Sequence, residues 1–120
     1  MAADLSNLDT FTRAYIECAL WSSTNDAGEP FDTTGAELAA ETLSTMVSDC
    51  TIFQDDRTRW KAISGNPSQA GHDFWLTRNG HGAGFWDGDW PEPDATMLTE
   101  AAHSYGECEL YVGDDGLIYC

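Results

Sequence analysis

Apolar residues recur at helical spacing in two segments of the first half of the chain. The first segment runs to about Trp21, and Asp9 just before it can cap its N-terminus. Its apolar stripe repeats every three or four positions, at Phe11, Ala14, Tyr15, Cys18 and Ala19. The second segment is predicted from about Gly35 to Gln54, with Thr34 and Glu37 at the spacing of a capping box. Both segments are therefore predicted to be amphipathic helices.

Three shorter segments have weaker patterns. Residues 22–32 contain Asn, Gly and Pro and are predicted to form a loop. Residues 57–61 hold three basic residues around Trp60 and are predicted to form a short helical turn. Residues 64–71 are rich in Gly, Asn, Pro and Ser, which again predicts a loop.

A strand is predicted for residues 72–77, because Phe74, Trp75 and Thr77 favour an extended backbone. Residues 85–86 are its expected antiparallel partner, across a Gly-rich tip at residues 79–84. These residues are therefore predicted to form a β-hairpin.

The last part of the chain predicts one helix and a second hairpin. Asp94 can cap a helix that ends at Gly106. The strands 109–112 and 117–119 are expected to pair across a turn at residues 113–116. The element order is ααββαββ, which predicts an α+β fold whose antiparallel sheet of three to four strands, formed by two hairpins, packs against about three helices.

Composition changes this picture mainly through charge. The 120 residues, with 42% hydrophobic content, predict a single folded domain over residues 1–120. The chain holds 21 acidic and five basic residues, for a net charge of −16, and residues 79–120 contain no Lys or Arg. The electric field of so negative a chain repels nucleic acid and attracts basic surfaces, so no direct binding to nucleic acid is expected.

The cysteines and the N-terminus bear on localisation. Cys18, Cys50, Cys108 and Cys120 form no CxxC pair and are interpreted as free thiols, and a Cys108–Cys120 disulfide across the last hairpin is allowed but not expected. No signal peptide and no apolar run long enough to span a membrane is present. The chain is therefore predicted to be soluble and cytoplasmic, without a membrane partner.

The densest set of reactive side chains lies in and around the Gly-rich tip. It could bind a phosphorylated or carboxylated ligand, as in a small binding module or enzyme, through His72, Asp73, Arg78, Asn79 and His81. The competing interpretation is a structural one, in which Arg78 pairs with a nearby carboxylate. No catalytic motif, cofactor motif or metal-binding spacing occurs, so no enzyme, cofactor or metal site is predicted.

Three strings carry a resemblance to a known family. They are GHDFWLTRNGHGAGFWD at 71–87, AYIECALWSST at 14–24 and LYVGDDG at 110–116. Together they resemble a family of small acidic proteins encoded by bacteriophages and prophages. The resemblance implies a phage origin and a role in the cytoplasm of the infected cell, and it brings no catalytic residue with it.

Charge and resemblance together lead to a functional hypothesis. The protein is expected to bind and inhibit a basic, nucleic-acid-binding host protein, as a DNA mimic of the anti-defence or anti-CRISPR type whose carboxylates replace phosphates. The expected contact residues are Asp87, Asp89, Trp90, Glu92, Asp94, Glu107, Glu109, Asp114 and Asp115, with Trp90 as an exposed apolar anchor. An alternative is that the protein is an acidic accessory phage protein whose charge serves solubility alone. The sequence does not indicate an oligomeric state.

Overall fold

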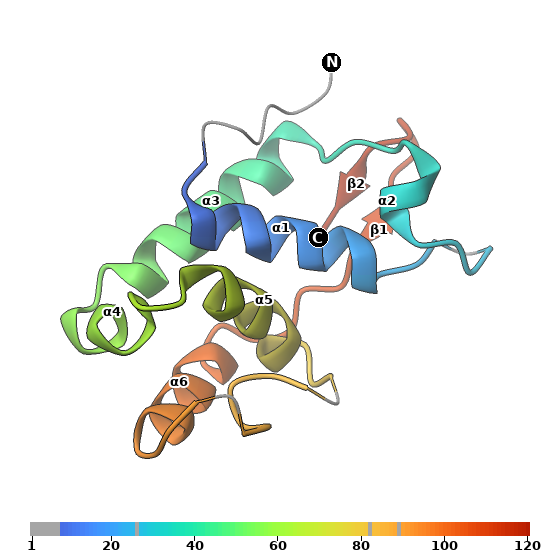
Figure 1. Cartoon of the computed structure of the whole chain (residues 1–120). Coiled ribbons are helices and arrows are strands. Elements are labelled where there is room, and N and C mark those ends of the chain that lie inside the picture. The colour runs from blue at the N-terminus through green and yellow to red at the C-terminus, as the bar shows by residue number, and fades with distance from the viewer. Residues whose placement is uncertain (1–7, 26, 82, 89) are drawn as a thin grey trace.

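The structure is mostly helical. The computed structural model describes residues 8–25, 27–81, 83–88 and 90–120, and these form six helices and one two-stranded sheet (Figure 1). The elements are α1 (Thr10–Ser22), α2 (Phe31–Thr34), α3 (Ala40–Gln54), α4 (Arg57–Ile63), α5 (Pro67–Arg78), α6 (Asp94–His103), β1 (Tyr111–Val112) and β2 (Ile118–Tyr119). The predicted three- to four-stranded sheet covered by about three helices is therefore wrong.

The first helix forms as predicted. The Asp9 side chain accepts a hydrogen bond from the Thr12 backbone N–H at 2.9 Å, and the helix continues one residue past Trp21. Its apolar stripe is buried, with Phe11 and Tyr15 both inaccessible to solvent. The cap and the stripe agree, which is why the sequence located this element well.

The second predicted helix begins later than expected, at Ala40 rather than Gly35. Gly35 adopts a left-handed conformation (φ +76°) directly after α2, and this conformation interrupts a right-handed helix. Beyond it, the Glu37 carbonyl accepts from the Ile118 N–H and the Ala39 N–H donates to the Ile118 carbonyl. Residues 37–39 are thus held extended beside β2, and the predicted capping box does not form.

The region predicted as a loop followed by a strand is a single helix, α5. Asn66 accepts a hydrogen bond from the Gln69 N–H at 3.4 Å, and Pro67 occupies the first helical position, where its missing N–H costs nothing. The aromatic residues 74 and 75 face the core from this helix rather than from a strand. Their preference for extended backbone is overridden by tertiary packing.

Gly71 lies inside α5 because another helix passes very close to it. A Cβ at this position would overlap the Phe11 carbonyl oxygen of α1 and would crowd the Tyr15 backbone nitrogen. The two helices make the most extensive contact between elements of the described chain. This glycine therefore permits close helix packing and does not indicate a loop.

The predicted first hairpin is absent from the described residues, and residues 83–88 form turns. Phe85 is fully buried, its N–H donates to the Thr77 hydroxyl at 2.9 Å, and its ring stacks on Phe53 with centroids 5.9 Å apart. Trp86 is exposed to solvent. Residues 85 and 86 thus belong to a loop, and the buried ring of Phe85 anchors that loop to the core.

Of the remaining helices, α2 was not predicted, since residues 22–32 were expected to form a loop, whereas α4 and α6 agree with the sequence apart from one cap. The basic turn predicted at 57–61 is part of α4, which Asp56 caps by accepting from the Arg59 N–H. Helix α6 forms, but its N-terminus is capped by Glu92, which accepts from the Thr96 N–H at 2.8 Å. Asp94 lies in the first turn instead.

The C-terminal hairpin is confirmed. Tyr111 pairs with Tyr119 and Val112 with Ile118 in antiparallel register. Cys108 and Cys120 form a disulfide with their Cα atoms 5.6 Å apart, so the interpretation of these two residues as free thiols is wrong. Cys18 and Cys50 are free and buried, as expected.

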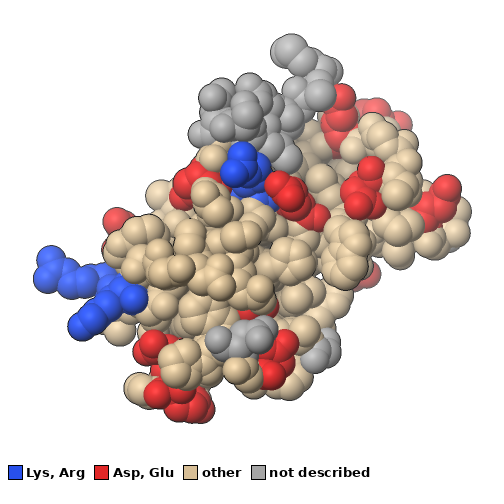
Figure 2. Space-filling model, in the orientation of Figure 1, with Lys and Arg blue, Asp and Glu red and all other residues tan. Residues whose placement is uncertain are grey.

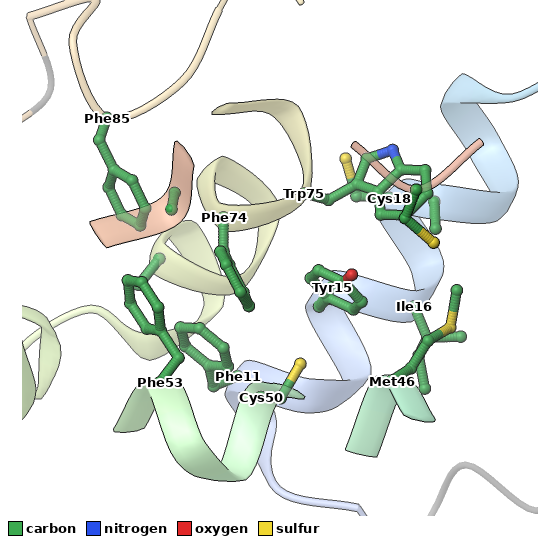
Figure 3. Packing of buried hydrophobic residues seen from close by; sticks show 14 of the residues in the cluster. Phe11, Tyr15, Ile16, Cys18, Met46, Cys50, Phe53, Phe74, Trp75 and Phe85 are labelled. Atoms are coloured by element: carbon green, nitrogen blue, oxygen red, sulfur yellow. The ribbon is translucent and has the colours of Figure 1, made fainter. Parts of the chain in front are cut away.

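One aromatic core joins the helices (Figure 3). The rings of Phe53 and Phe74 stack with centroids 4.3 Å apart, and Phe11 approaches both. Tyr15 meets Trp75 edge to face with centroids 5.4 Å apart. The hairpin lies at the end of the molecule remote from α4, beside α2 and the loop that precedes α2 (Figure 1).

Candidate functional site

The main surface depression runs between the end of α1 and the chain that enters the hairpin. One hollow of about 370 Å³ is lined by Ser22, Ser23, Thr24, Trp75, Asn79, His81, Glu107, Cys108, Glu109 and Leu110. A second, of about 590 Å³, is lined by Thr24, Asn25, Ala27, Phe31, Glu109, Leu110, Tyr111 and Val112. The two share Thr24, Glu109 and Leu110 and so lie side by side, and together they are here called the hairpin groove.

The end of α5 fixes one wall of the hairpin groove. Arg78 donates to the Gly106 carbonyl at 2.9 Å and to the Tyr105 carbonyl at 3.1 Å. Asn79 accepts from the Cys108 N–H at 2.7 Å. These three hydrogen bonds attach residues 105–108 to the helical core, so the groove wall is held in a defined position.

Arg78 also forms a buried polar network, which confirms its predicted pairing with a carboxylate. Its guanidinium donates to Asp49 and to the Tyr15 hydroxyl, each at 3.0 Å. Burial raises the pKa of Tyr15 well above its usual value, since the ionised phenol would lose its hydration. Burial alone would lower the pKa of Arg78, but the negative charges that Tyr15 and Asp49 can carry outweigh it and leave that pKa raised. Arg78 is therefore a structural cation.

The residues of the alternative ligand site do not line a common cavity. Asn79 and His81 lie in the hairpin groove. His72 lies instead beside the Trp21 ring, with centroids 6.3 Å apart, in a separate hollow. Asp73 is buried and accepts hydrogen bonds from side chains of its own core. A ligand could not contact all five residues at once.

Trp90 is not the exposed anchor that the sequence predicted. Its side chain is 9% exposed, and its indole N–H donates to Asp73 at 2.6 Å. Its ring meets Phe85 edge to face, with centroids 5.7 Å apart. A Trp flanked by acids and prolines is thus a core residue with its one polar atom satisfied.

The acids of the predicted contact set fall into separate groups. Glu107 and Glu109 line the hairpin groove, and Asp114 and Asp115 form the hairpin turn beside Glu41. The remaining described members are Asp87, which accepts from the Gly84 N–H at 3.3 Å, Glu92, which precedes α6, and Asp94 in the first turn of α6. Asp89 lies outside the described residues.

A second acidic stretch, which the sequence reasoning missed, joins the groove acids. Residues 22–39 contain four acidic residues and no Lys or Arg, and residues 107–120 contain four more, again without a base. Hydrogen bonds to Ile118 and the shared groove bring the described residues of the two stretches together as one unit, here called the hairpin end, while Asp26 lies outside the described residues. The signal was present in the sequence, since no Lys or Arg occurs from residue 14 to residue 56.

The basic residues lie elsewhere. Arg57, Arg59 and Lys61 are on α4, Arg78 is buried, and Arg13 is in the first turns of α1. Figure 2 shows basic side chains projecting at the edge where Figure 1 places α4, with acidic side chains around the opposite end. Basic residues are therefore absent from the described part of the hairpin end, whereas the α4 end carries both signs.

Apolar side chains are also exposed at and beside the hairpin end. Tyr111 is 55% exposed and Val112 is 44% exposed, both on β1. Trp21, 60% exposed, borders a hollow that it shares with Glu17 and Asp32. Exposed aromatic groups next to carboxylates are typical of protein-binding surfaces. The sequence favoured Trp90 for this role, because local composition does not show which Trp is buried.

Within the described part of the chain, no group of three or more His, Cys, Asp or Glu side chains is arranged to hold a metal ion. None of the described helices combines the length and the apolar character needed to cross a membrane.

Comparisons with known proteins returned no match to a protein-family model, to a curated protein or to a solved structure. Function must therefore be inferred from the geometry and charge of this chain.

Proposed function

We propose that the protein binds and inhibits a basic, nucleic-acid-binding protein of the host cell through its hairpin end. The observation that carries this proposal is the charge asymmetry: two stretches without a single Lys or Arg come together around the hairpin groove. The resemblance to phage-encoded proteins makes a bacterial host protein the target to test first.

Electrostatics supports this choice of partner. A protein that grips nucleic acid presents Lys and Arg at positions matched to phosphates, and a rigid array of carboxylates can occupy those positions. Like charges gathered on one face also speed encounter with a basic surface, and they do so less as salt increases. Exposed Tyr111 and Val112 add apolar area at the same end, which a surface serving solubility alone would not need.

The test is capture of proteins from bacterial lysate on the immobilised protein, at low and at physiological salt, with the captured proteins identified by mass spectrometry. A basic nucleic-acid-binding protein should be retained and should be released by competing DNA or RNA. Its nuclease or DNA-binding activity should fall when the protein is added. Salt should weaken the interaction steeply.

Two charge-reversed variants give a matched comparison. Glu107→Lys/Glu109→Lys changes the hairpin groove, whereas Asp55→Lys/Glu100→Lys makes the same change in net charge at exposed positions just after α3 and on α6. The groove variant should lose binding and the control should keep most of it. Equal loss in both would show that overall charge, not the hairpin end, attracts the partner. If no such protein is captured and the protein simply gains stability in molar salt, its acidity serves solubility alone.

A further inference from the structure

The outer edge of β1 presents backbone groups that point away from the sheet. Ile118 in β2 uses its N–H and its carbonyl to bond residues 37 and 39, on the side opposite to β1. In an antiparallel pair, two residues directly opposite each other both point their backbone N–H and carbonyl toward the partner strand, or both point them away from it. Val112, which faces Ile118, therefore directs its own N–H and carbonyl to the outer side of β1.

The turn geometry supports this register. The Gly113 N–H donates to the Leu117 carbonyl at 2.8 Å, so residues 113 and 117 form a hydrogen-bonded pair. The next pair along the ladder, Val112 with Ile118, is then a non-hydrogen-bonded pair. Both observations place the free edge of the sheet at Val112.

The space beyond this edge is open. The wider hollow of the hairpin groove, about 590 Å³, lies between β1 and the loop that contains Thr24, Asn25 and Ala27. Phe31 and Leu110 contribute an apolar lining and are otherwise buried. An added strand would lie about 4.8 Å from β1, and Val112, whose backbone it would meet, is among the residues that line this hollow.

The two faces of β1 differ in character. Along β1 and the two residues before it, Leu110 is buried, while Glu109 and Tyr111 are exposed, and all three line the wider hollow. Because alternate residues of an extended chain point to opposite faces, Glu109 shares its face with Tyr111. On that face Tyr111 stacks on Tyr119, beside the carboxylates of Glu41, Asp114 and Asp115. One face is thus apolar and the other acidic.

We infer that β1 accepts an extended segment of the partner as an additional strand, with Lys or Arg alternating with apolar residues. The inference rests on the proposed function and specifies how the basic partner is recognised. Main-chain hydrogen bonds to Val112 hold the segment, its apolar residues face Phe31 and Leu110, and its cations face Glu109 and the turn carboxylates. An uncovered edge strand is otherwise prone to uncontrolled pairing.

The probe is a capped peptide of about ten residues that alternates Lys and Val, long enough to cover a typical strand. Its control carries N-methyl groups on alternate residues, which removes half of the peptide donors without changing charge. Binding to the full chain is followed by fluorescence anisotropy at fixed salt. Hydrogen exchange of the Val112 amide is followed by NMR with and without the peptide.

Two variants separate the backbone from the side chain. Val112→Pro removes the outward N–H, and proline is tolerated at an edge position whose N–H faces away from the sheet. Val112→Ala keeps the N–H. We expect the unmodified peptide to bind, to protect the Val112 amide, and to lose about tenfold in affinity with Val112→Pro but little with Val112→Ala. Circular dichroism checks the fold of each variant. If Val112→Pro fails to fold, the methylated peptide and the exchange measurement on the unaltered protein decide the question.

Three results would overturn the inference. Equal binding of the methylated peptide with no protection of Val112 would mean that charge alone attracts the peptide, and lysate capture would still support the proposed function. Absence of any peptide binding would also rule out the added strand. If the protein alone forms a dimer that protects Val112, a second copy occupies the edge instead. Failure of the proposed function is recognised separately, by the absence of a captured basic protein.

Discussion

The hairpin end holds acidic residues without a Lys or Arg, whereas the α4 end holds charges of both signs, and the two ends also differ in how their polar groups are used. At the α4 end, Arg59 donates to the Phe53 carbonyl at 2.8 Å and to the Ile52 carbonyl at 3.2 Å, which satisfies the C-terminus of α3. Asp56 caps α4 and Glu92 caps α6 in the same region. Several charged residues there therefore have structural tasks.

At the hairpin end, by contrast, the groove carboxylates remain available. No described residue donates a hydrogen bond to Glu107 or Glu109, and both are exposed. The edge at Val112 also directs its backbone groups outward. The difference indicates that Asp56 and Arg59 at the α4 end serve the fold, whereas Glu107 and Glu109 at the hairpin end are available to a partner.

The largest expected effect comes from removing Arg78, the cation that ties the hairpin end to the helices. Arg78→Met breaks its bonds to Asp49, Tyr105 and Gly106 and leaves these groups without their donor. Breaking a buried ion pair on one side costs about 3–5 kcal/mol, a large part of a domain's stability. Chemical denaturation should show this loss in the free energy of unfolding.

Arg57→Met is the matched control, because Arg57 is an exposed cation on α4. It should change the free energy of unfolding by less than about 0.5 kcal/mol. Similar losses in both variants would show that Arg78 acts only through the overall charge of this acidic chain and would remove its role as the link between the two ends.

The sequence predicted well those elements whose local signals agree with the tertiary structure. Helix α1 has a cap and an apolar stripe, and the hairpin around residues 113–116 has a turn with glycines at its ends. The prediction for residues 67–78 was wrong because Gly71 was interpreted as a loop residue, whereas it lies inside α5 and leaves room for the backbone at Phe11. Asn66 followed by Pro67 was a helix-start signal that local composition obscured.

The candidate site was predicted only in part, for a different reason. Glu107, Glu109, Asp114 and Asp115 were all included in the predicted contact set, since charge is visible in the sequence. Burial is not visible in the sequence, so Trp90 was wrongly predicted to be the exposed anchor. The contribution of residues 22–39 depends on a contact with residue 118 that no local pattern could indicate.

A smaller effect, confined to the hairpin end, is expected from the disulfide. Cys108 and Cys120 are 12 residues apart, and a bridge of this span contributes about 3 kcal/mol by restricting the unfolded chain. Reductant should therefore accelerate hydrogen exchange at β1 and β2 in the unaltered protein but not in Cys108→Ser/Cys120→Ser. Thiol alkylation followed by mass spectrometry, with and without reductant, would verify which form each sample holds.

Reduction should leave the α4 end unaffected, because the bridge joins only residues of the hairpin end. Hydrogen exchange should accelerate at β1 and β2 while the amides of α1 and α5 keep their protection. Uniform acceleration throughout the chain would mean that the hairpin and the helices unfold as one cooperative unit, and the two ends would then not be independent in stability.

The smallest expected effect is local and depends on pH. The Tyr119 hydroxyl donates to Asp115 at 2.6 Å, and this hydrogen bond raises the pKa of Tyr119 to about 12. A raised pKa in the folded state means that the bond contributes its full stability below the usual tyrosine pKa near 10 and loses it as the pH rises through about 12. NMR titration of the ring, assigned with Tyr119→Phe, should show this pKa, and Asp115→Asn should return it toward 10.

Glu109→Gln is the control, because it removes a carboxylate of the same end that does not accept this bond. If both substitutions lower the pKa equally, the general negative field of the hairpin end is its cause. If only Asp115→Asn does so, the turn carboxylate is held in place by Tyr119, and its geometry is fixed before any partner arrives.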